Sequence, residues 1–154
     1  MDKISKNHYL HYKKALSSKK LFLTPGCHDP LSAKLIEKEK FNFIFIGGFA
    51  LSSGQYGYPD AGIITLSELV SSTRKIQRST NLPCIVDADT GFGGTINIYR
   101  TVRDLADIGV AALIIEDQEF PKKCALTEKV KILNFQESCE RIKAAVKAAK
   151  ENKN

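Results

Sequence analysis

Apolar and polar residues follow one another in a repeating order that predicts four β-strands, each followed by a helix. Nearly continuous apolar runs bounded by Gly or Pro predict strands, and apolar positions at helical spacing predict helices. The predicted strands are residues 21–23, 43–46, 84–86 and 112–115. The predicted helices are a short leading one at 9–16 and then 30–39, 66–78, 97–108 and 135–150. Thr65 or Ser67 is a candidate N-cap for the helix at 66–78.

This order of elements predicts an α/β fold with a parallel sheet. Short, almost continuously apolar strands are typical of parallel sheets that helices cover, and right-handed crossovers keep successive strands pointing the same way. The sequence shows no linker, low-complexity tract or internal repeat. Residues 1–154 are therefore expected to form a single domain of four βα units.

Acidic residues follow the third and fourth predicted strands. Asp87 and Asp89 come directly after the apolar run at 84–86, and Glu116 follows the run at 112–115. Parallel strands would bring the three carboxylates to the same edge of the sheet, where α/β folds place their active sites. Mg²⁺ prefers oxygen ligands, so this pattern indicates a metal site. The alternative is that some of these acids cap the helices that follow.

Composition and net charge restrict the classes of protein to which this chain can belong. With 43% hydrophobic and 26% charged residues, the 154-residue chain is expected to be globular, and no apolar run approaches the ~20 residues that a membrane span needs. The net charge of +6 comes from dispersed lysines without interleaved aromatic residues, which favours a solvated surface over nucleic-acid binding. The first residues lack a secretory signal and the four cysteines lack CxxC spacing, so a cytoplasmic location is expected.

Five motifs, taken together and in order, resemble those of the isocitrate lyase and phosphoenolpyruvate mutase superfamily. They are Thr-Pro-Gly at 24–26 with Asp29 and Ser-Ala at 32–33, then residues 54–60, 86–93, 115–118 and 121–124. A single Asp-x-Asp would be weak evidence, whereas five ordered motifs are specific. The resemblance implies a (β/α)₈ barrel and a Mg²⁺-dependent enzyme that acts on small 2-oxo or 2-hydroxy carboxylates through an enolate-like species.

The resemblance also implies roles for the acids. Asp87 and Asp89 correspond to the acids of the family's Mg²⁺ site, Glu116 to a further ligand and Asp60 to another acid around the metal. Mn²⁺ is an alternative ion. Mg²⁺ next to an enolate oxygen would stabilise the negative charge that develops when a bond beside a carboxylate breaks.

A glycine pair is the candidate substrate-binding turn. Gly47 and Gly48 correspond to the place where the family's backbone amides and often a serine hydroxyl hold the substrate carboxylate, with Asp87 close by. Here Gly47 replaces that serine, so one hydroxyl donor is missing. Backbone amides can still bind an anion.

The loop at 120–126 carries the candidate acid–base chemistry and combines features of two branches. The lyase branch has Lys-Lys/Arg-Cys-Gly-His here, and this chain keeps Lys122, Lys123 and Cys124 but has Ala-Leu in place of Gly-His. The mutase and phosphonopyruvate hydrolase branch has Pro-Lys, which Pro121 and Lys122 match. Cys124 and Lys122 are the candidate catalytic residues. Alternatively, Cys124 is an incidental small residue on a loop.

Length is the main departure from the family. A complete (β/α)₈ barrel needs about 250 residues, and this chain ends after four predicted units, so it corresponds to half of a barrel. The sequence predicts a lyase of small carboxylates whose activity in this form is open. The alternatives are a phosphoenolpyruvate mutase or phosphonopyruvate hydrolase, and a non-catalytic assembly module. Unpaired strand edges also predict a homo-oligomer.

Overall fold

The structure, a computed structural model, describes residues 3–125 and 127–152, and this part of the chain forms one four-stranded parallel sheet in the order β1-β2-β3-β4. The strands are β1 (Gly26–Cys27), β2 (Ile44–Ile46), β3 (Cys84–Asp87) and β4 (Ala112–Ile114). The helices are α1 (Lys3–Leu16), α2 (Pro30–Lys38), α3 (Leu66–Ser79), α4 (Thr95–Ala106) and α5 (Phe135–Glu151), with a short π-helix η1 (Ala50–Gln55) after β2. The predicted α/β class and the parallel sheet are confirmed.

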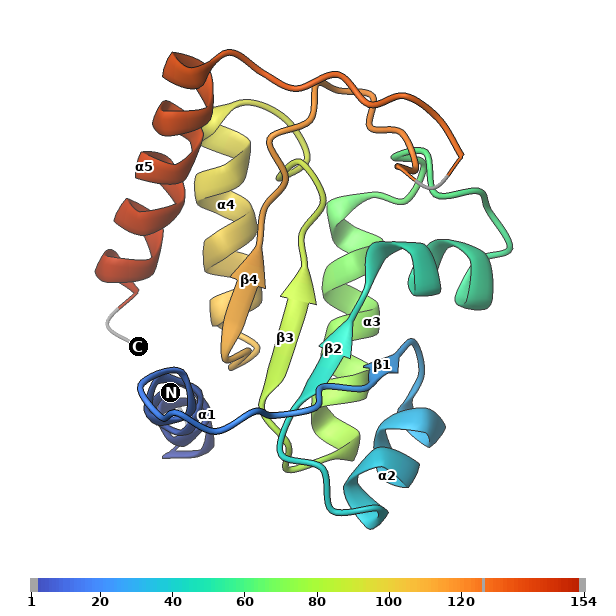
Figure 1. Cartoon of the computed structure of the whole chain (residues 1–154), viewed down its shortest axis with the longest axis vertical. Helices are drawn as coiled ribbons and strands as arrows, with labels where there is room; N and C mark the ends of the chain where they lie inside the picture. The colour runs from blue at the N-terminus through green and yellow to red at the C-terminus, as the bar shows by residue number, and fades with distance from the viewer. Residues whose placement is uncertain (1–2, 126, 153–154) are drawn as a thin grey trace.

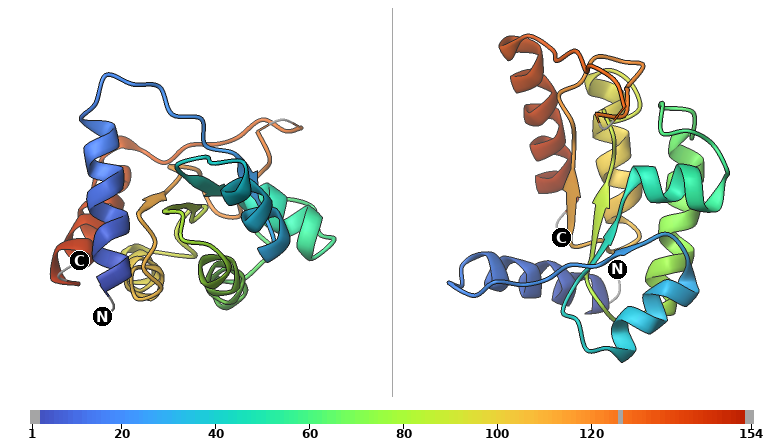
Figure 2. Two further views of the ribbon diagram at one scale, coloured as in Figure 1. Left: turned by 90° about the horizontal axis from the view of Figure 1, so that it is seen from below. Right: turned by 45° about the vertical axis from the view of Figure 1, so that its right-hand side comes forward.

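The helices that follow the four strands all lie on one face of the sheet. Figure 1 shows α3 and α4 behind the strands, with α5 beside α4 and α2 beside α3. The view from below in Figure 2 shows the same one-sided arrangement, and α1 lies across the amino ends of the strands. A doubly wound sheet would carry helices on both faces, whereas a barrel carries them only on the outside. The fold is therefore part of a (β/α) barrel.

Burial differs sharply between the two faces of the sheet. Ile44, Ile46, Cys84 and Val86 are inaccessible to solvent and pack in the same core as side chains of α2 and α3. Because side chains alternate along a strand, Phe45 and Ile85 point to the opposite face, and they remain partly exposed. The core thus lies between the sheet and its helices, and the face that a closed barrel would enclose is open.

Two predictions about local structure were wrong. Residues 21–23 form no strand: Leu21 and Leu23 are 89% and 67% exposed, while Phe22 packs edge-on against the ring of Phe43. Pairing with β2 begins only at Pro25, whose carbonyl accepts a bond from Phe45 N at 2.9 Å. An apolar run does not by itself show where two strands meet. The segment after β2, for which the sequence pattern predicts neither a strand nor a helix, contains η1.

The remaining helices agree with their predicted ranges to within a few residues, although α1 begins at Lys3 rather than at residue 9. Among the described residues, no helix is long and apolar enough to cross a membrane.

A capping box starts α3 and confirms Thr65 as its N-cap. The Thr65 hydroxyl accepts from Glu68 N at 3.3 Å, and the Glu68 carboxylate accepts from Thr65 N at 2.7 Å. The bond from the Thr65 amide holds the pKa of Glu68 below its usual value. A lowered carboxyl pKa means that this stabilisation is present at neutral pH and is lost as the pH falls through the folded-state pKa.

We expect Thr65→Ala to reduce the free energy of unfolding by about 1 kcal/mol, because Glu68 N loses its acceptor and the Glu68 carboxylate loses the hydroxyl that donates to it. Urea unfolding followed by circular dichroism measures the change. Ser67→Ala is the matched control, since Ser67 is exposed and takes no part in the cap. Equal losses for the two variants would contradict the role of Thr65.

Candidate active site

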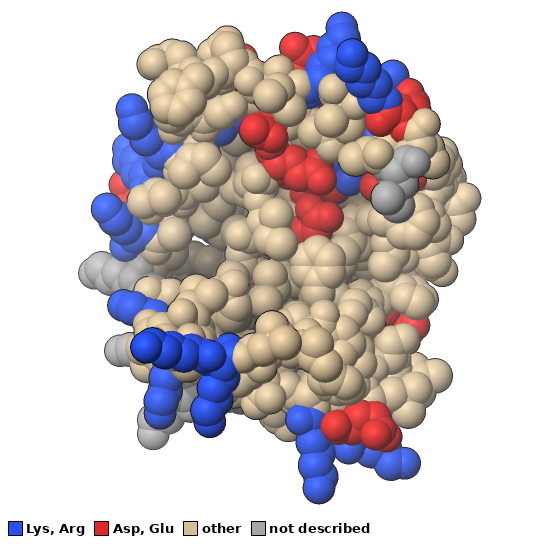
Figure 3. Space-filling model, viewed as in Figure 1, with Lys and Arg blue, Asp and Glu red and all other residues tan. Residues whose placement is uncertain are grey.

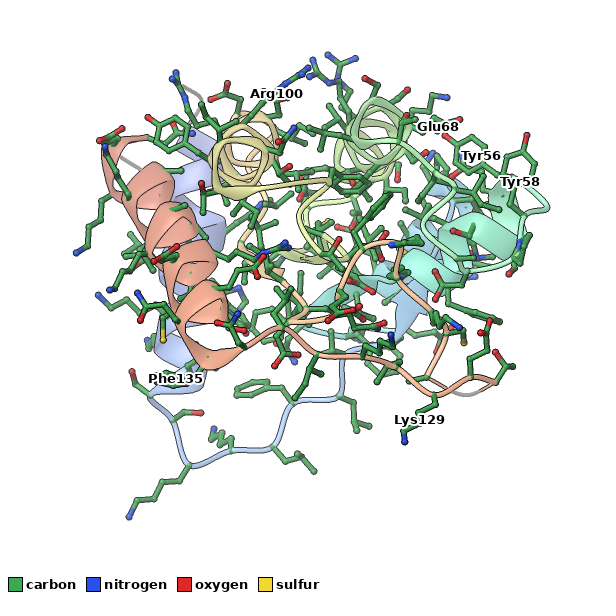
Figure 4. The ribbon with its side chains drawn as sticks, turned by 90° about the horizontal axis from the view of Figure 1, so that it is seen from above. Tyr56, Tyr58, Glu68, Arg100, Lys129 and Phe135 are labelled. Atoms are coloured by element: carbon green, nitrogen blue, oxygen red, sulfur yellow. The ribbon has the colours of Figure 1, made fainter. Side chains whose placement is uncertain are left out.

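Acidic side chains from three segments meet at the carboxyl ends of the strands. Asp87 ends β3, Glu116 follows β4, and Asp60 belongs to the segment between η1 and α3. Figure 3 shows Asp and Glu side chains gathered in a hollow at this end, surrounded mostly by uncharged surface. Figure 4 looks down on the same end, with Tyr56 and Tyr58 at one side and Phe135, the first residue of α5, at the other. The edge predicted to hold the site does bring these acids together.

The turn after β2 supports Asp87 by a very close backbone approach. Gly48 N donates to Asp87 Oδ2 at 3.1 Å, so this amide orients the acid. A Cβ at Gly48 would lie 2.5 Å from Asp89 Oδ1, so any side chain at this position would displace the Asp89 carboxylate. A Cβ at Gly47 would lie 3.1 Å from the Phe45 ring. The missing side chains at both positions therefore make room for the acids and for Phe45.

Asp89 is the most deeply buried of the acids. It is 4% exposed and has a φ of 48°, a left-handed conformation that its short side chain tolerates. Its amide donates to Asp87 Oδ1 at 3.0 Å, and its carbonyl accepts from Glu116 N at 2.8 Å. Burial, with smaller contributions from the charges of Asp87 and Asp60, raises the pKa of Asp89 to about 6 even though Lys122 opposes the change. Desolvation thus makes the negative charge here costly.

Lys122 supplies the positive charge inside the cluster. Its side chain is 3% exposed, and its ammonium donates to Asp89 Oδ1 and lies 2.8 Å from Asp60 Oδ1. Burial alone would lower the pKa of Lys122, but its electrostatic interactions with Asp60 and Asp89 outweigh burial and raise that pKa above its usual value. Lys122 therefore remains charged and joins the loop after β4 to the ends of the other strands.

Gln118 is a functional candidate that sequence reasoning missed. It is 8% exposed, donates to Glu116 Oε2 at 2.8 Å and accepts from Lys123 N at 3.1 Å. It therefore fixes both the acid and the start of the loop that carries Lys122. Burial raises the pKa of Glu116, and the charges of Asp87 and Asp60 add to this change, whereas the charge of Lys122 opposes it. In the sequence, the only indication of this role was the position of Gln118 two residues after Glu116.

The chemistry of these side chains fits a hard divalent cation. Four carboxylates, those of Asp60, Asp87, Asp89 and Glu116, surround the single ammonium of Lys122, and carboxylate oxygens are the donors that Mg²⁺ prefers. Asp60 Oδ1 is buried yet accepts no hydrogen bond from the described residues, because its contact with Lys122 is not aligned for one. In the described part of the chain no three His, Cys, Asp or Glu side chains are already arranged as a metal site. Lys122 occupies the space between Asp60 and Asp89.

The alternative role of the acids as helix caps is wrong for the acids after β3. The N-cap of α4 is Gly94, and no side chain caps this helix. The turn at 89–93 instead has left-handed backbone at four of its residues, including Gly91, where a Cβ would lie 2.3 Å from Ile98 Cγ1. Arg141 of α5, 9% exposed, also supports this turn by donating to Thr90 O at 3.3 Å. Its role was not visible in the sequence.

Cys124 lies half-buried two residues after Lys122. Its carbonyl accepts from the amides of Thr127 and Glu128, which forms a turn. Within the described residues, no hydrogen bond connects its thiol to the acids. Lys123 points elsewhere and pairs with Glu128 at 2.6 Å on the surface. Of the two lysines, therefore, only Lys122 lies in the site, where its ammonium forms ion pairs with Asp60 and Asp89.

Comparison with known proteins identifies the family. A family model described as phosphoenolpyruvate phosphomutase matches residues 13–154. The chain belongs to this family. It is 40% identical over 134 residues to 2,3-dimethylmalate lyase of Eubacterium barkeri, covering 87% of this chain and 46% of that protein. It is 37% identical over 138 residues to 2-methylisocitrate lyase of Bacillus subtilis (strain 168), covering 90% and 46%.

Solved structures of the same family share the fold. Phosphoenolpyruvate phosphomutase from Streptomyces platensis subsp. rosaceus gives a TM-score of 0.86 at 32% identity, over 91% of this chain and 49% of that one. A phosphonopyruvate hydrolase in complex with oxalate and Mg²⁺ gives a TM-score of 0.82 at 34% identity, over 92% and 48%. The chain thus spans about half the length of these family members, and the predicted resemblance is confirmed.

We expect Lys122→Met to lower the free energy of unfolding by about 3 kcal/mol in the presence of EDTA, because it leaves buried carboxylates without a counter-charge. Urea unfolding at one fixed protein concentration measures the loss. The control is Lys123→Met, whose exposed ion pair contributes at most about 1 kcal/mol.

Adding Asp89→Asn to Lys122→Met should recover part of the loss, since one of the unpaired charges is then removed. If the two side chains do not interact, the losses of unfolding free energy in the two single variants should simply add in the double variant. Such additivity would contradict the ion pair.

Proposed function

We propose that this chain carries the acidic half-site of a Mg²⁺-dependent lyase that cleaves a C–C bond in small 2-hydroxy or 2-oxo carboxylates. The observation that carries the proposal is the meeting of Asp60, Asp87, Asp89 and Glu116 around a single buried cation, Lys122. Such an excess of carboxylates in a partly buried hollow favours binding of a further cation. The lyases among the relatives support the same reaction class.

Asp87, Asp89, Asp60 and Glu116 would hold Mg²⁺, which when bound supplies Lewis-acid stabilisation of an enolate oxygen. Other residues of the chain position these acids. Gly48 N and Gln118 orient Asp87 and Glu116. Lys122 joins the loop after β4 to Asp60 and Asp89. Preorganised groups of this kind act without reorganising during the reaction.

Cys124 is the candidate for proton transfer at the substrate carbon. The lyase branch of the family has a cysteine at this place in the loop, and Cys124 follows Lys122 by two residues. Its half-buried position on a loop contrasts with the buried thiols of Cys27 and Cys84. A thiol that transfers protons must be reached by the substrate, which a position on this loop allows.

The second candidate function is that of a phosphoenolpyruvate mutase or phosphonopyruvate hydrolase. Pro121 and Lys122 favour it, because that branch has Pro-Lys at the same place, and the structural similarity to a phosphonopyruvate hydrolase agrees. Turnover assays with 2-methylisocitrate, 2,3-dimethylmalate, oxaloacetate and phosphonopyruvate separate the two candidates. The third candidate, a non-catalytic assembly module, predicts neither turnover nor metal binding.

Mg²⁺ should stabilise the folded chain, since binding to the native state alone raises its stability. At ten times the dissociation constant the gain is about 1.4 kcal/mol, which corresponds to roughly 3–6 °C in the thermal midpoint. Asp89→Asn should remove most of this shift, whereas Glu128→Gln, which changes an exposed acid of the loop, should retain it. If millimolar Mg²⁺ leaves the wild-type midpoint unchanged, the metal assignment fails.

Iodoacetamide should alkylate Cys124 well before Cys27 and Cys84, because burial raises the pKa of Cys27 to about 12 and also raises that of Cys84. Peptide mass spectrometry distinguishes these sites from Cys139, which is also half-buried. In this chain or in a longer relative with the same loop, Cys124→Ser should reduce any lyase turnover by about 100-fold or more and preserve the Mg²⁺ shift. Equal labelling of Cys124 and Cys84, or unchanged turnover, would argue against the role of Cys124.

A further inference from the structure

The turn that carries Asp89 has an unusual backbone. Asp89 and Phe92 have φ values of 48° and 62°, which residues other than glycine rarely adopt, and Gly91 and Gly93 lie in the same region of positive φ. Such a conformation persists only where the surrounding structure holds it. It brings the buried carboxylate of Asp89 to the ammonium of Lys122. The contacts that hold this turn therefore determine where that carboxylate lies.

Four consecutive carbonyl groups of the turn, at residues 88–91, each accept a hydrogen bond from a different donor. Two of the donors are backbone amides. Gly91 N donates to Ala88 O at 2.8 Å, and Glu116 N donates to Asp89 O at 2.8 Å. These two bonds close the turn on itself and join it to the end of β4.

The other two carbonyls are held by side chains from two helices. Thr101 Oγ1 of α4 donates to Gly91 O at 3.1 Å, and Arg141 Nη1 of α5 donates to Thr90 O at 3.3 Å. Thr90 and Thr101 are buried and Arg141 is only 9% exposed, so water competes little for these bonds. The guanidinium is itself held by Glu137 Oε1 at 3.1 Å, one helical turn earlier. Both side chains thus connect the turn to helices that pack against each other.

We propose that Thr101 and Arg141 are positioning residues for the acidic site, which fix the turn and through it the carboxylate of Asp89. This role rests on the proposed function, because the place of this carboxylate affects metal binding only if Asp89 is a ligand of Mg²⁺. Groups that orient metal ligands commonly change metal affinity by about 10- to 100-fold when they are removed. The alternative is that the two side chains only fill space between α4, α5 and the sheet.

Two substitutions at Thr101 separate its hydroxyl from its volume. Thr101→Val keeps the volume and removes the donor, whereas Thr101→Ser keeps the donor and removes a methyl group. In calorimetric titration with Mg²⁺, Thr101→Val should weaken binding by about 10-fold, and Thr101→Ser should remain within about 2-fold of the wild type. Urea unfolding establishes that each variant is folded.

The same comparison applies to Arg141. Arg141→Met should weaken Mg²⁺ binding by about 10-fold, and Arg141→Lys, which keeps a donor on a long side chain, should bind at least about 3-fold more tightly than Arg141→Met. Tyr99→Phe is the control for helix packing, because it removes the hydrogen bond from Tyr99 of α4 to Glu151 of α5 and leaves the turn untouched. It should bind Mg²⁺ as the wild type does.

Amide hydrogen exchange in EDTA measures the turn without any metal. In Thr101→Val and Arg141→Met, the amides of Gly91 and Glu116 should exchange at least about 5-fold faster than in the wild type, since loss of one ordinary hydrogen bond allows that much more opening. The amide of Leu69 in α3, which donates to Thr65 O, should keep its rate.

Unchanged exchange at Gly91 and Glu116 in both variants would overturn the positioning role. Equal weakening of Mg²⁺ binding by Thr101→Val and Thr101→Ser would also overturn it, because the volume rather than the donor would then matter. A wild-type chain that binds no Mg²⁺ but shows the expected exchange differences would refute the proposed function and support the positioning of the turn.

Discussion

The burial of several carboxylates at one edge of the sheet is the constraint on which the site depends. Parallel strands place their carboxyl ends together, so Asp87, Asp89 and Glu116 cannot avoid one another. Lys122 partly compensates for their charge, and its ion pairs fix the position of the loop after β4 that carries it. The ion pairs of Lys122 therefore determine where the segment after β4 lies, whereas the burial of Asp89 raises its pKa and the close approach of Asp89 leaves little room for a side chain at Gly48.

A second constraint comes from the placement of the helices. In the described part of the chain, α2 to α5 cover only one face of the sheet and leave side chains of the other face partly exposed. In a closed barrel the strands themselves enclose this face. The molecule thus has a well-packed outer layer, with Ile44, Val86 and Leu69 at no more than 1% exposure, beside an inner face that is partly open. The core and the open face result from the same topology.

Much of this could be predicted from the sequence, because helix periodicity, Gly and Pro boundaries and the acids after strands are local signals. They gave α2 to α5 to within a few residues and the convergence of Asp87 and Glu116. Three features depended on contacts between distant residues: the pairing of β1 at Gly26 rather than at residues 21–23, the insertion of Lys122 between Asp60 and Asp89, and the support of the turn by Arg141. No local pattern encodes such contacts, since they arise only when the strands are already in register.

The site and the open edges are physically connected. The acids lie at the carboxyl ends of strands whose inner face is unenclosed, so water can approach the hollow from the side that a closed barrel would seal. Water weakens electrostatic interactions by raising the local dielectric constant, which reduces both the cost of the clustered carboxylates and the benefit that they offer to a bound cation. Enclosure of this face would therefore strengthen the electrostatic interactions among Asp60, Asp87, Asp89 and Lys122.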